Sequence, residues 1–309
     1  MEKRDLVIIG AGPAGISAAK AARAKGVEDI LLLDRLALPG GILPQCLHRG
    51  FGSGAPGKKL NGPEFASLIL QDLDKGIEVR MDSAVICLAN DKALTVAGMG
   101  RVYEVLAKAV ILATGCRERP VGALPVCGTR PAGVFTAGSV QKMLNLSGYR
   151  VGSRAVVLGS GDVGMIVAHH LAESGTEVLA IVEKEDRVGG LKRNKSLYVD
   201  AHGIPTLTRH TVTELHGLRR LEAVTVCKVD AYGAPMPETG YLLPCDTLIS
   251  SVGLIPELEL LQNLPAPVPW LFVCGNARRV YRFAGSVIND GKRAGEFAAA
   301  YLSRELVLK

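Results

Sequence analysis

The chain contains two short apolar runs, each followed by glycines and then by an alanine-containing stretch. Leu6–Ile9 and Ala155–Leu158 are rich in β-branched residues, as buried parallel strands are. The stretches after them have helical spacing and stop near Gly26 and Gly175, which suit the C-terminal end of a helix. A second apolar run then ends at an acidic residue in both places. The pattern predicts two βαβ units, each with a parallel sheet.

The rest of the chain is predicted to form shorter strands and one long helix. Apolar and polar residues alternate over 76–103, which predicts an antiparallel sheet, and 225–243 is also β-like. Further strands are predicted at 109–115, 247–253 and 270–275, and a last helix at 285–306.

These elements predict an α/β fold with two Rossmann-like dinucleotide-binding domains, the second inserted in the first. A length of 309 residues fits two domains better than one. No long polar linker separates them, so the boundaries are set by strand pattern near Arg119–Pro120 and Gly253. One domain is expected to comprise residues 1–119 and 253–309, and the other residues 120–252.

An internal repeat supports two copies of one unit. Eight positions of the first unit recur at their own number plus 149, seven as identities and one as an exchange of carboxylates. The pairs are Gly10/Gly159, Gly12/Gly161, Gly15/Gly164, Ala19/Ala168, Gly26/Gly175, Asp34/Glu183, Gly40/Gly189 and Gly41/Gly190.

The first glycine cluster has the features of a dinucleotide site. In such a turn the first glycine allows the tight bend, the second admits a pyrophosphate, and the third lets the helix pack on the strand. The helix N-terminus adds N–H groups and partial positive charge. Asp34 ends the second apolar run, where a carboxylate can accept hydrogen bonds from a ribose. The candidate cofactor-binding residues here are Gly10, Gly12, Pro13, Ala14, Gly15, Asp34 and Arg35.

The second cluster repeats this logic. Glu183 would accept a hydrogen bond from a free 2′-hydroxyl and repel a 2′-phosphate, so NAD is expected rather than NADP. The neighbouring cations Lys184 and Arg187 keep NADP as the weaker alternative. The candidate residues are Gly159, Gly161, Asp162, Gly164 and Glu183.

Composition narrows the class of protein. The net charge of 36 − 30 = +6 comes without a basic tail or an aromatic platform, so no nucleic-acid partner is expected. Seven scattered cysteines read as reduced thiols, and His169 and His170, adjacent on one helix, are not expected to bind a metal. The start lacks the apolar core of a signal peptide, and no apolar run reaches membrane-spanning length. We therefore expect a cytoplasmic protein without a membrane span.

The motifs resemble those of the pyridine nucleotide-disulfide oxidoreductases, and the resemblance covers nearly the whole chain. It includes both glycine clusters, the acid-to-glycine spacing of Asp34 to Gly40–Gly41, and the stretches Ala113–Gly115 and Val273–Asn276. The resemblance implies that FAD binds the first unit together with the C-terminal segment, and that the central unit binds the nicotinamide cofactor. Its size is similar to that of the thioredoxin-reductase-like branch. The further cofactor residues it implies are Gly40, Gly41, Thr114, Gly115, Gly275 and Asn276.

Two departures from that family matter. Asn276 stands where the family has an aspartate, and its amide could keep the hydrogen bond to the flavin's ribityl chain without the charge. The chain also lacks both arrangements of paired cysteines that disulfide reductases use. A redox-active dithiol is therefore not expected.

A narrower resemblance concerns the segment after the glycine pair. Gly40–His48 and Cys274–Asn276 are similar to flavoproteins encoded beside glycerol-3-phosphate dehydrogenases, and to FAD/NAD subunits of opine, sarcosine and proline dehydrogenases. This implies a partner, namely a substrate-oxidising dehydrogenase subunit. Cys46 and His48 are catalytic candidates beside a flavin, the thiol as a contact and the imidazole as a proton relay. The alternative is that both side chains only pack.

The sequence leaves three functions open. The first is an FAD-dependent oxidoreductase that transfers hydride between NAD(H) and flavin. The second is an electron-transfer subunit of a multi-subunit dehydrogenase, with little activity alone, and the third is a nucleotide-binding sensor. A homodimer is also open.

Overall fold

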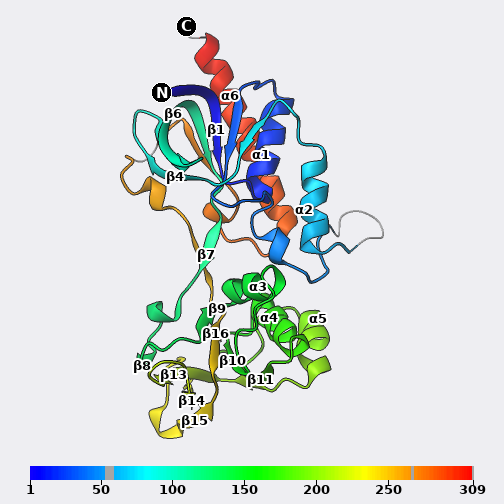
Figure 1. The fold of residues 1–309 in the computed structure, drawn as a ribbon, viewed down its shortest axis with the longest axis vertical. Helices are drawn as coiled ribbons and strands as arrows, with labels where there is room; N and C mark the ends of the chain where they lie inside the picture. The colour runs from blue at the N-terminus through cyan, green and yellow to red at the C-terminus, as the bar shows by residue number, and fades with distance from the viewer. Residues whose placement is uncertain (53–58, 266–267, 308–309) are drawn as a thin grey trace. The chain divides into compact units, whose positions relative to one another are not determined.

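The computed structural model describes residues 1–52, 59–265 and 268–307, and the chain divides into two compact units. Unit 1 combines Met1–Arg117 with Ile255–Lys309, and unit 2 is the continuous segment Glu118–Leu254. In Figure 1, unit 1 accordingly runs from blue to cyan and again from orange to red. Both divisions lie two residues from the expected ones, since 120 − 118 = 2 and 255 − 253 = 2.

Unit 1 is built on a parallel sheet. Its strand order is β3-β2-β1-β6, with β18 paired to the far edge of β6. Side chains of β1 alternate between two cores, Leu6 and Ile8 in one and Val7 and Ile9 in the other. Burial on both faces explains why these strands are continuously apolar in the sequence. The strands are β1 (Glu2–Ile9), β2 (Ile30–Leu33), β3 (Glu78–Arg80), β6 (Arg101–Leu112) and β18 (Leu271–Val273).

An antiparallel branch leaves this sheet at β6. β4 (Ser83–Leu88) and β5 (Ala93–Gly98) form a meander with the first half of β6. The antiparallel sheet predicted over 76–103 is confirmed for these strands but wrong for β3, which runs parallel to β2. The reason is that α2 (Gly62–Gln71) lies between β2 and β3, and a helical crossover returns the chain in the parallel direction.

Two helices of unit 1 pack closely against each other. They are α1 (Pro13–Ala24), in the first βαβ unit, and α6 (Ala284–Val307), the predicted last helix. A Cβ atom added at Gly291 of α6 would lie 2.1 Å from the carbonyl oxygen of Ala14 in α1. The backbones can approach this closely only because position 291 has no side chain.

Unit 2 holds a second parallel sheet, in the order β12-β11-β10-β16-β9. Helices α3 (Ala137–Asn145) and α4 (Asp162–Glu173) contribute to the core on one of its faces. Two nucleotide-binding-type sheets are thus present, which confirms the predicted α/β fold. The strands are β9 (Val134–Thr136), β10 (Arg154–Leu158), β11 (Glu177–Glu183), β12 (Thr206–Thr208) and β16 (Thr247–Ser250).

The other face of that sheet shares a core with a four-stranded sheet, in the order β15-β14-β13-β8. The β-like stretch predicted at 225–243 is confirmed, whereas β13 was not predicted. The strands are β8 (Cys127–Gly128), β13 (His210–His216), β14 (Ala223–Lys228) and β15 (Tyr241–Pro244). β7 (Cys116–Glu118) and β17 (Leu254–Pro256) form a two-stranded sheet where the chain passes between units.

Short helical turns complete the chain. They are η1 (Leu43–Gln45), η2 (Val121–Ala123), α5 (Lys192–Asn194), η3 (Lys195–Val199), η4 (Asp200–His202), η5 (Pro237–Thr239), η6 (Glu259–Leu261) and η7 (Gly275–Ala277). Among the helices in the described ranges, none has the length and apolar character needed to cross a bilayer.

Candidate nucleotide-binding sites

The first glycine turn joins β1 to α1. Gly10 has a φ of +110°, and a Cβ there would lie 2.4 Å from the carbonyl oxygen of Ala113. Only glycine fits this bend. At Gly12 the nearest atom to an added Cβ is the Cα of Gly41, at 3.7 Å. The turn therefore leaves space beside the helix N-terminus, where a phosphate binds in such motifs.

Asp34 closes this turn from the end of β2. The residue is 9% exposed, and its two carboxylate oxygens accept hydrogen bonds from the backbone N–H groups of Ala11 (2.7 Å) and Leu36 (2.8 Å). Each oxygen keeps a second lone pair, so the carboxylate can position the turn and still accept from a ribose hydroxyl. The N–H of Gly40 also donates to the carbonyl oxygen of Ala11 at 2.8 Å, which brings the Gly40–Gly41 pair against the turn.

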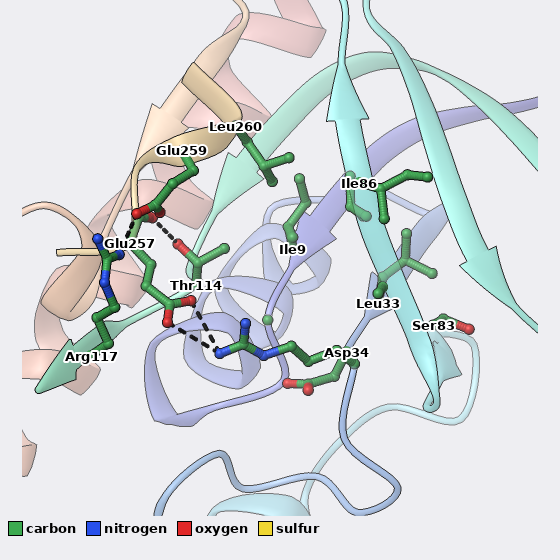
Figure 2. Close-up of a pocket in the computed structure, with 14 residues that line it drawn as sticks. Ile9, Leu33, Asp34, Ser83, Ile86, Thr114, Arg117, Glu257, Glu259 and Leu260 are labelled. Atoms are coloured by element: carbon green, nitrogen blue, oxygen red, sulfur yellow. Dashed lines mark hydrogen bonds and ion pairs between the residues drawn. The ribbon is translucent and has the colours of Figure 1, made fainter. Parts of the chain in front are cut away.

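A cavity of about 450 Å³ opens at the carboxyl ends of β1 and β2. Parallel α/β sheets bind ligands at this edge, and the volume is within the usual range of ligand pockets. Figure 2 shows Leu33 and Ile86 on one side of the cavity, and Glu257, Arg117 and Glu259 on the other. An apolar wall opposite a charged one suits a flat heterocycle attached to a polar chain.

Ion pairs cross the charged side of the cavity. Arg35 Nη2 lies 3.1 Å from Glu257 Oε2, and Arg117 pairs with Glu259. Thr114 Oγ1 donates to the backbone oxygen of Glu257 at 2.7 Å. Arg35 and Thr114, both predicted as cofactor residues, thus reach the cavity wall and hold the segment after β17.

Glu257 and Glu259, which form part of this wall, were not predicted from the sequence. They are more than 220 residues from Arg35 along the chain, and only the return of the C-terminal segment brings them to the cavity. No local motif marks them.

Cys46 directly follows η1, and His48 lies two residues further along the chain. The Cys46 thiol is 7% exposed and donates to the backbone oxygen of Ile42 at 3.4 Å, and the His48 ring lies 5.1 Å from the ring of Phe51. Burial raises the pKa of the Cys46 thiol to about 12. The thiol is therefore neutral at physiological pH, whereas a nucleophilic cysteine must be a thiolate.

The turn after β18 is held by a buried carboxylate from α6. Asp290 accepts a hydrogen bond from the N–H of Gly275 (2.9 Å) and pairs with Arg278. Asn276 Oδ1 accepts from the N–H of Tyr281 at 3.0 Å, so its carboxamide also stabilises the turn. Both predicted residues of this motif, Gly275 and Asn276, are part of one fixed loop.

The second glycine turn reproduces the first in its hydrogen bonds. Gly159 has a φ of +101°, and its N–H donates to Val182 O at 2.8 Å, as the N–H of Gly10 donates to Leu33 O at 2.7 Å. Glu183 is 9% exposed, and its oxygens accept from the N–H groups of Ser160 and Glu185, both at 2.9 Å.

These partners occupy the same places in the repeat as those of Asp34. Ser160 corresponds to Ala11 and Glu185 to Leu36, since 160 − 11 and 185 − 36 both equal 149. The sequence repeat is thus also a repeat of contacts.

In the second turn, unlike the first, side chains of the turn form hydrogen bonds with the loop that follows the second strand. Ser160 Oγ donates to Glu183 and accepts from the N–H of Gly189 at 2.9 Å. Asp162 accepts from the N–H of Leu191 (2.7 Å) and from Asn194 Nδ2 (2.8 Å). The predicted cofactor residue Asp162 therefore anchors the segment that follows the glycine pair.

All seven cysteines lie in the described part of the chain, and all are free thiols. Cys46 and Cys274 are buried, whereas Cys87 and Cys127 are exposed. Cys116 and Cys127, which flank the crossover between the units, are not bonded to each other.

Some of the known proteins that this chain resembles are named as subunits of oxidases. The chain is 27% identical over 289 residues to an opine oxidase subunit of Agrobacterium tumefaciens (strain Ach5), covering 86% of this chain and 55% of that one. It is 29% identical over 248 residues to the alpha subunit of sarcosine oxidase from Corynebacterium sp. (strain U-96), covering 73% of this chain and 24% of that one. The chain thus spans about half or less of the length of these relatives, and the predicted likeness to opine and sarcosine enzymes is confirmed.

A solved structure shares the fold. The thioredoxin reductase of T. acidophilum superposes with a TM-score of 0.73 at 22% identity, over 99% of this chain and 100% of that one. Residues 4–271 match the model of a family described as pyridine nucleotide-disulphide oxidoreductase, whose members typically bind FAD and a pyridine nucleotide. By this match the chain belongs to the pyridine nucleotide-disulphide oxidoreductase family.

Proposed function

We propose that unit 1 binds FAD and unit 2 binds NAD(H), and that the chain is an oxidoreductase that transfers a hydride between the two cofactors. The observation that carries this proposal is the pair of glycine turns closed by buried carboxylates, with equivalent backbone partners in both copies of the repeat. FAD held there would supply a two-electron acceptor for the hydride of NADH, with the accompanying proton taken from solvent.

In unit 1, different residues would bind different parts of FAD. Gly10–Gly15 and the N-terminus of α1 would hold the pyrophosphate, and Asp34 would accept from the ribose. The 450 Å³ cavity would take the adenosine end, with Arg35 as one edge. Gly275 and Asn276 would hold the ribityl chain.

In unit 2, Glu183 would select NAD over NADP. Its carboxylate already accepts three hydrogen bonds from protein groups, so a 2′-phosphate would bring a second negative charge next to a buried acid. A ribose hydroxyl can donate to a remaining lone pair.

The proposed transfer uses no dithiol. Cys46 follows the glycine pair and is buried with a raised pKa, and no second cysteine lies within the segment 42–52. This segment would therefore offer no disulfide to accept electrons from a bound flavin.

A second candidate function is an electron-transfer subunit of a multi-subunit dehydrogenase. The observation that favours it is that the opine and sarcosine oxidase relatives are named as subunits. In this case a substrate-oxidising partner would be needed for turnover with a substrate.

The test is anaerobic titration of the purified chain with NADH, followed by flavin absorbance. Stoichiometric bleaching by NADH, at a rate at least tenfold greater than with NADPH, is the expected result. Protein that takes up no FAD would refute the proposal, and bound FAD that NADH never bleaches would favour a nucleotide sensor. Fast bleaching combined with negligible turnover on added acceptors would favour the electron-transfer subunit.

A further inference from the structure

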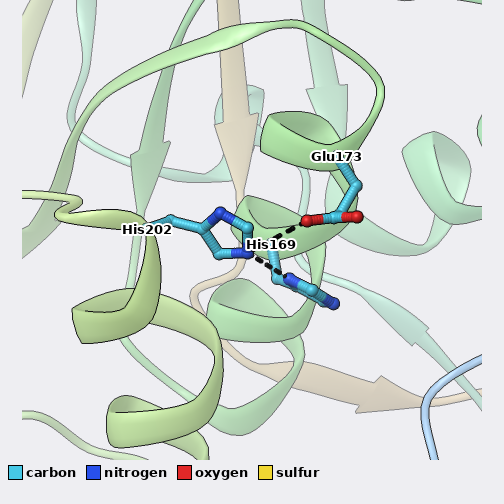
Figure 3. Close-up of side chains that lie close together, drawn as sticks. All are labelled: His169, Glu173 and His202. Atoms are coloured by element: carbon cyan, nitrogen blue, oxygen red, sulfur yellow. Dashed lines mark hydrogen bonds and ion pairs between the residues drawn. The ribbon is translucent and has the colours of Figure 1, made fainter.

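Three potential metal ligands meet on the surface of unit 2. His169 and Glu173 lie on one face of α4, since residues four apart in a helix are neighbours. His202 comes from η4, on a segment that returns beside the helix. One ligand atom from each residue lies within 4.8 Å of the other two. Figure 3 shows the dashed lines from His169 and Glu173 meeting at the ring of His202.

The ligand atoms converge on one point. His169 Nδ1 lies 2.7 Å from His202 Nε2, which in turn lies 3.4 Å from Glu173 Oε1. A single proton on His202 Nε2 can satisfy one neighbour well, whereas a divalent cation accepts lone pairs from all three groups. Two ligands bonded to zinc at about 2.1 Å lie roughly 3.4 Å apart at the tetrahedral angle. Small side-chain rotations would therefore give the required spacing.

From this geometry we infer a binding site for a divalent first-row transition ion of the zinc class, with His169, Glu173 and His202 as ligands. Two imidazoles and one carboxylate form a donor set that binds such ions in preference to magnesium or calcium. Partial exposure leaves further positions for water. The Tyr198 ring, whose centroid lies 4.9 Å from that of His169, closes one side.

Our sequence-based expectation of no metal considered only the adjacent pair His169–His170. It did not include His202, which lies beyond β11 and is brought to α4 only by the fold.

A bound ion would link α4 to the segment 192–202. The same segment reaches the start of α4 through the bond of Asn194 to Asp162. An ion at the far end of the helix would then fix both ends of the segment that flanks the second glycine turn. The site is separate from that turn, so its test does not depend on nucleotide binding.

The test is equilibrium dialysis of the full chain, prepared without a histidine tag, against micromolar Zn²⁺, with Co²⁺ absorption as a second readout. We expect one zinc per chain and at least tenfold weaker binding in His202→Gln. Glu173→Gln, an exposed substitution, should also weaken binding and keeps the test valid if His202→Gln fails to fold. Zinc should further slow amide hydrogen exchange over residues 192–202.

Two matched controls belong to the same unit. His170→Gln alters the neighbouring histidine, whose ring faces Asn145, and His216→Gln alters a histidine with one carboxylate, Glu214, at 3.8 Å. Both should retain zinc. No retained zinc in the wild-type chain, or equal losses in His202→Gln and His170→Gln, would overturn the inference and leave an imidazole–imidazole hydrogen bond only.

Discussion

Asp34 and Glu183 are buried carboxylates that shape their turns, and in the proposed function each would also accept a hydrogen bond from a ribose. Each accepts N–H bonds from the residue after the first glycine and from the second residue beyond itself. Bonds to an ionised group contribute more than neutral ones, about 1.5–3 kcal/mol each. Loss of the charge should therefore loosen the turn and weaken the nucleotide together.

Asp34→Asn should weaken FAD binding by at least tenfold, because an amide NH₂ would replace one acceptor and face a backbone N–H donor. Glu183→Gln is the reciprocal control. It should leave FAD content unchanged and weaken reduction by NADH. Flavin absorbance per chain and the NADH concentration dependence measure the two effects. Loss of FAD in both variants would contradict separate sites.

Cys46 should behave as a packed thiol. With a pKa of about 12 in the folded state, it should resist iodoacetamide at pH 8, while the exposed Cys87 and Cys127 react. Mass spectrometry of labelled peptides gives the three rates in one sample. Cys46→Ser should leave reduction by NADH largely intact. Rapid labelling of Cys46, or a large loss of reduction rate in Cys46→Ser, would support a catalytic thiol instead.

The same shift makes stability depend on pH in a defined direction. A thiol whose pKa rises from 9.0 to about 12 on folding stays protonated in the native state when the unfolded chain has lost its proton. The contribution is complete below pH 9 and is lost as pH rises toward 12. Urea unfolding at pH 8 and 10 should show this loss, and Cys46→Ser should show less of it.

At the level of elements, close backbone contact connects the C-terminal helix to the first glycine motif. Gly291 of α6 lies against Ala14, which is within the motif itself. Any displacement of α6 must therefore move the start of α1.

Gly291→Ala should destabilise unit 1 by about 1–3 kcal/mol, the usual cost of overpacking, and should reduce FAD content. Gly285→Ala is a matched control on the same helix, because no atom lies within 4 Å of the added Cβ. It should be neutral or stabilise the chain by up to about 1 kcal/mol. Denaturant unfolding of both variants, with and without FAD, measures the difference. Equal effects would disprove the close contact.

Elements could be predicted where one physical requirement dominates the sequence. β1, β2, β10 and β11 are buried on both faces, which forces continuous apolar runs. β13 was missed because His210–His216 mixes polar and apolar residues over an irregular pairing. α2 was missed although Asn61 and Glu64 form a capping box, with both bonds at 2.9 Å, that is readable as a sequence signal.

The residues of the candidate sites also fall into two groups, those that the sequence could locate and those that it could not. The glycine turns and their acids could be located because strand, turn and acid are close in the sequence. The glutamates of the cavity wall and the histidine of η4 could not be located from the sequence, because only tertiary packing brings them to their partners.

For the whole molecule, two units with separate cores should respond separately to ligands. A ligand that binds the native state raises the unfolding free energy by about 2.7 kcal/mol at a hundred times its Kd. In calorimetry of the full chain we expect two transitions, one shifted by FAD and the other by NAD⁺. Asp34→Asn should reduce the FAD shift and leave the NAD⁺ shift unchanged. A single transition moved equally by both ligands would rule out independent units.

The assembly of unit 1 from two distant segments affects how the protein is made. β18 and α6, which complete the first sheet and cover α1, leave the ribosome only after the whole of unit 2, Glu118–Leu254. At roughly 5–20 residues per second, synthesis of that unit takes on the order of 10 s. During this interval the face of α1 that packs against α6 has no covering helix, so unit 1 can complete its core only after unit 2 has been made. Under the proposed function, Gly275 and Asn276, the expected partners of the ribityl chain of FAD, also become available only at that point.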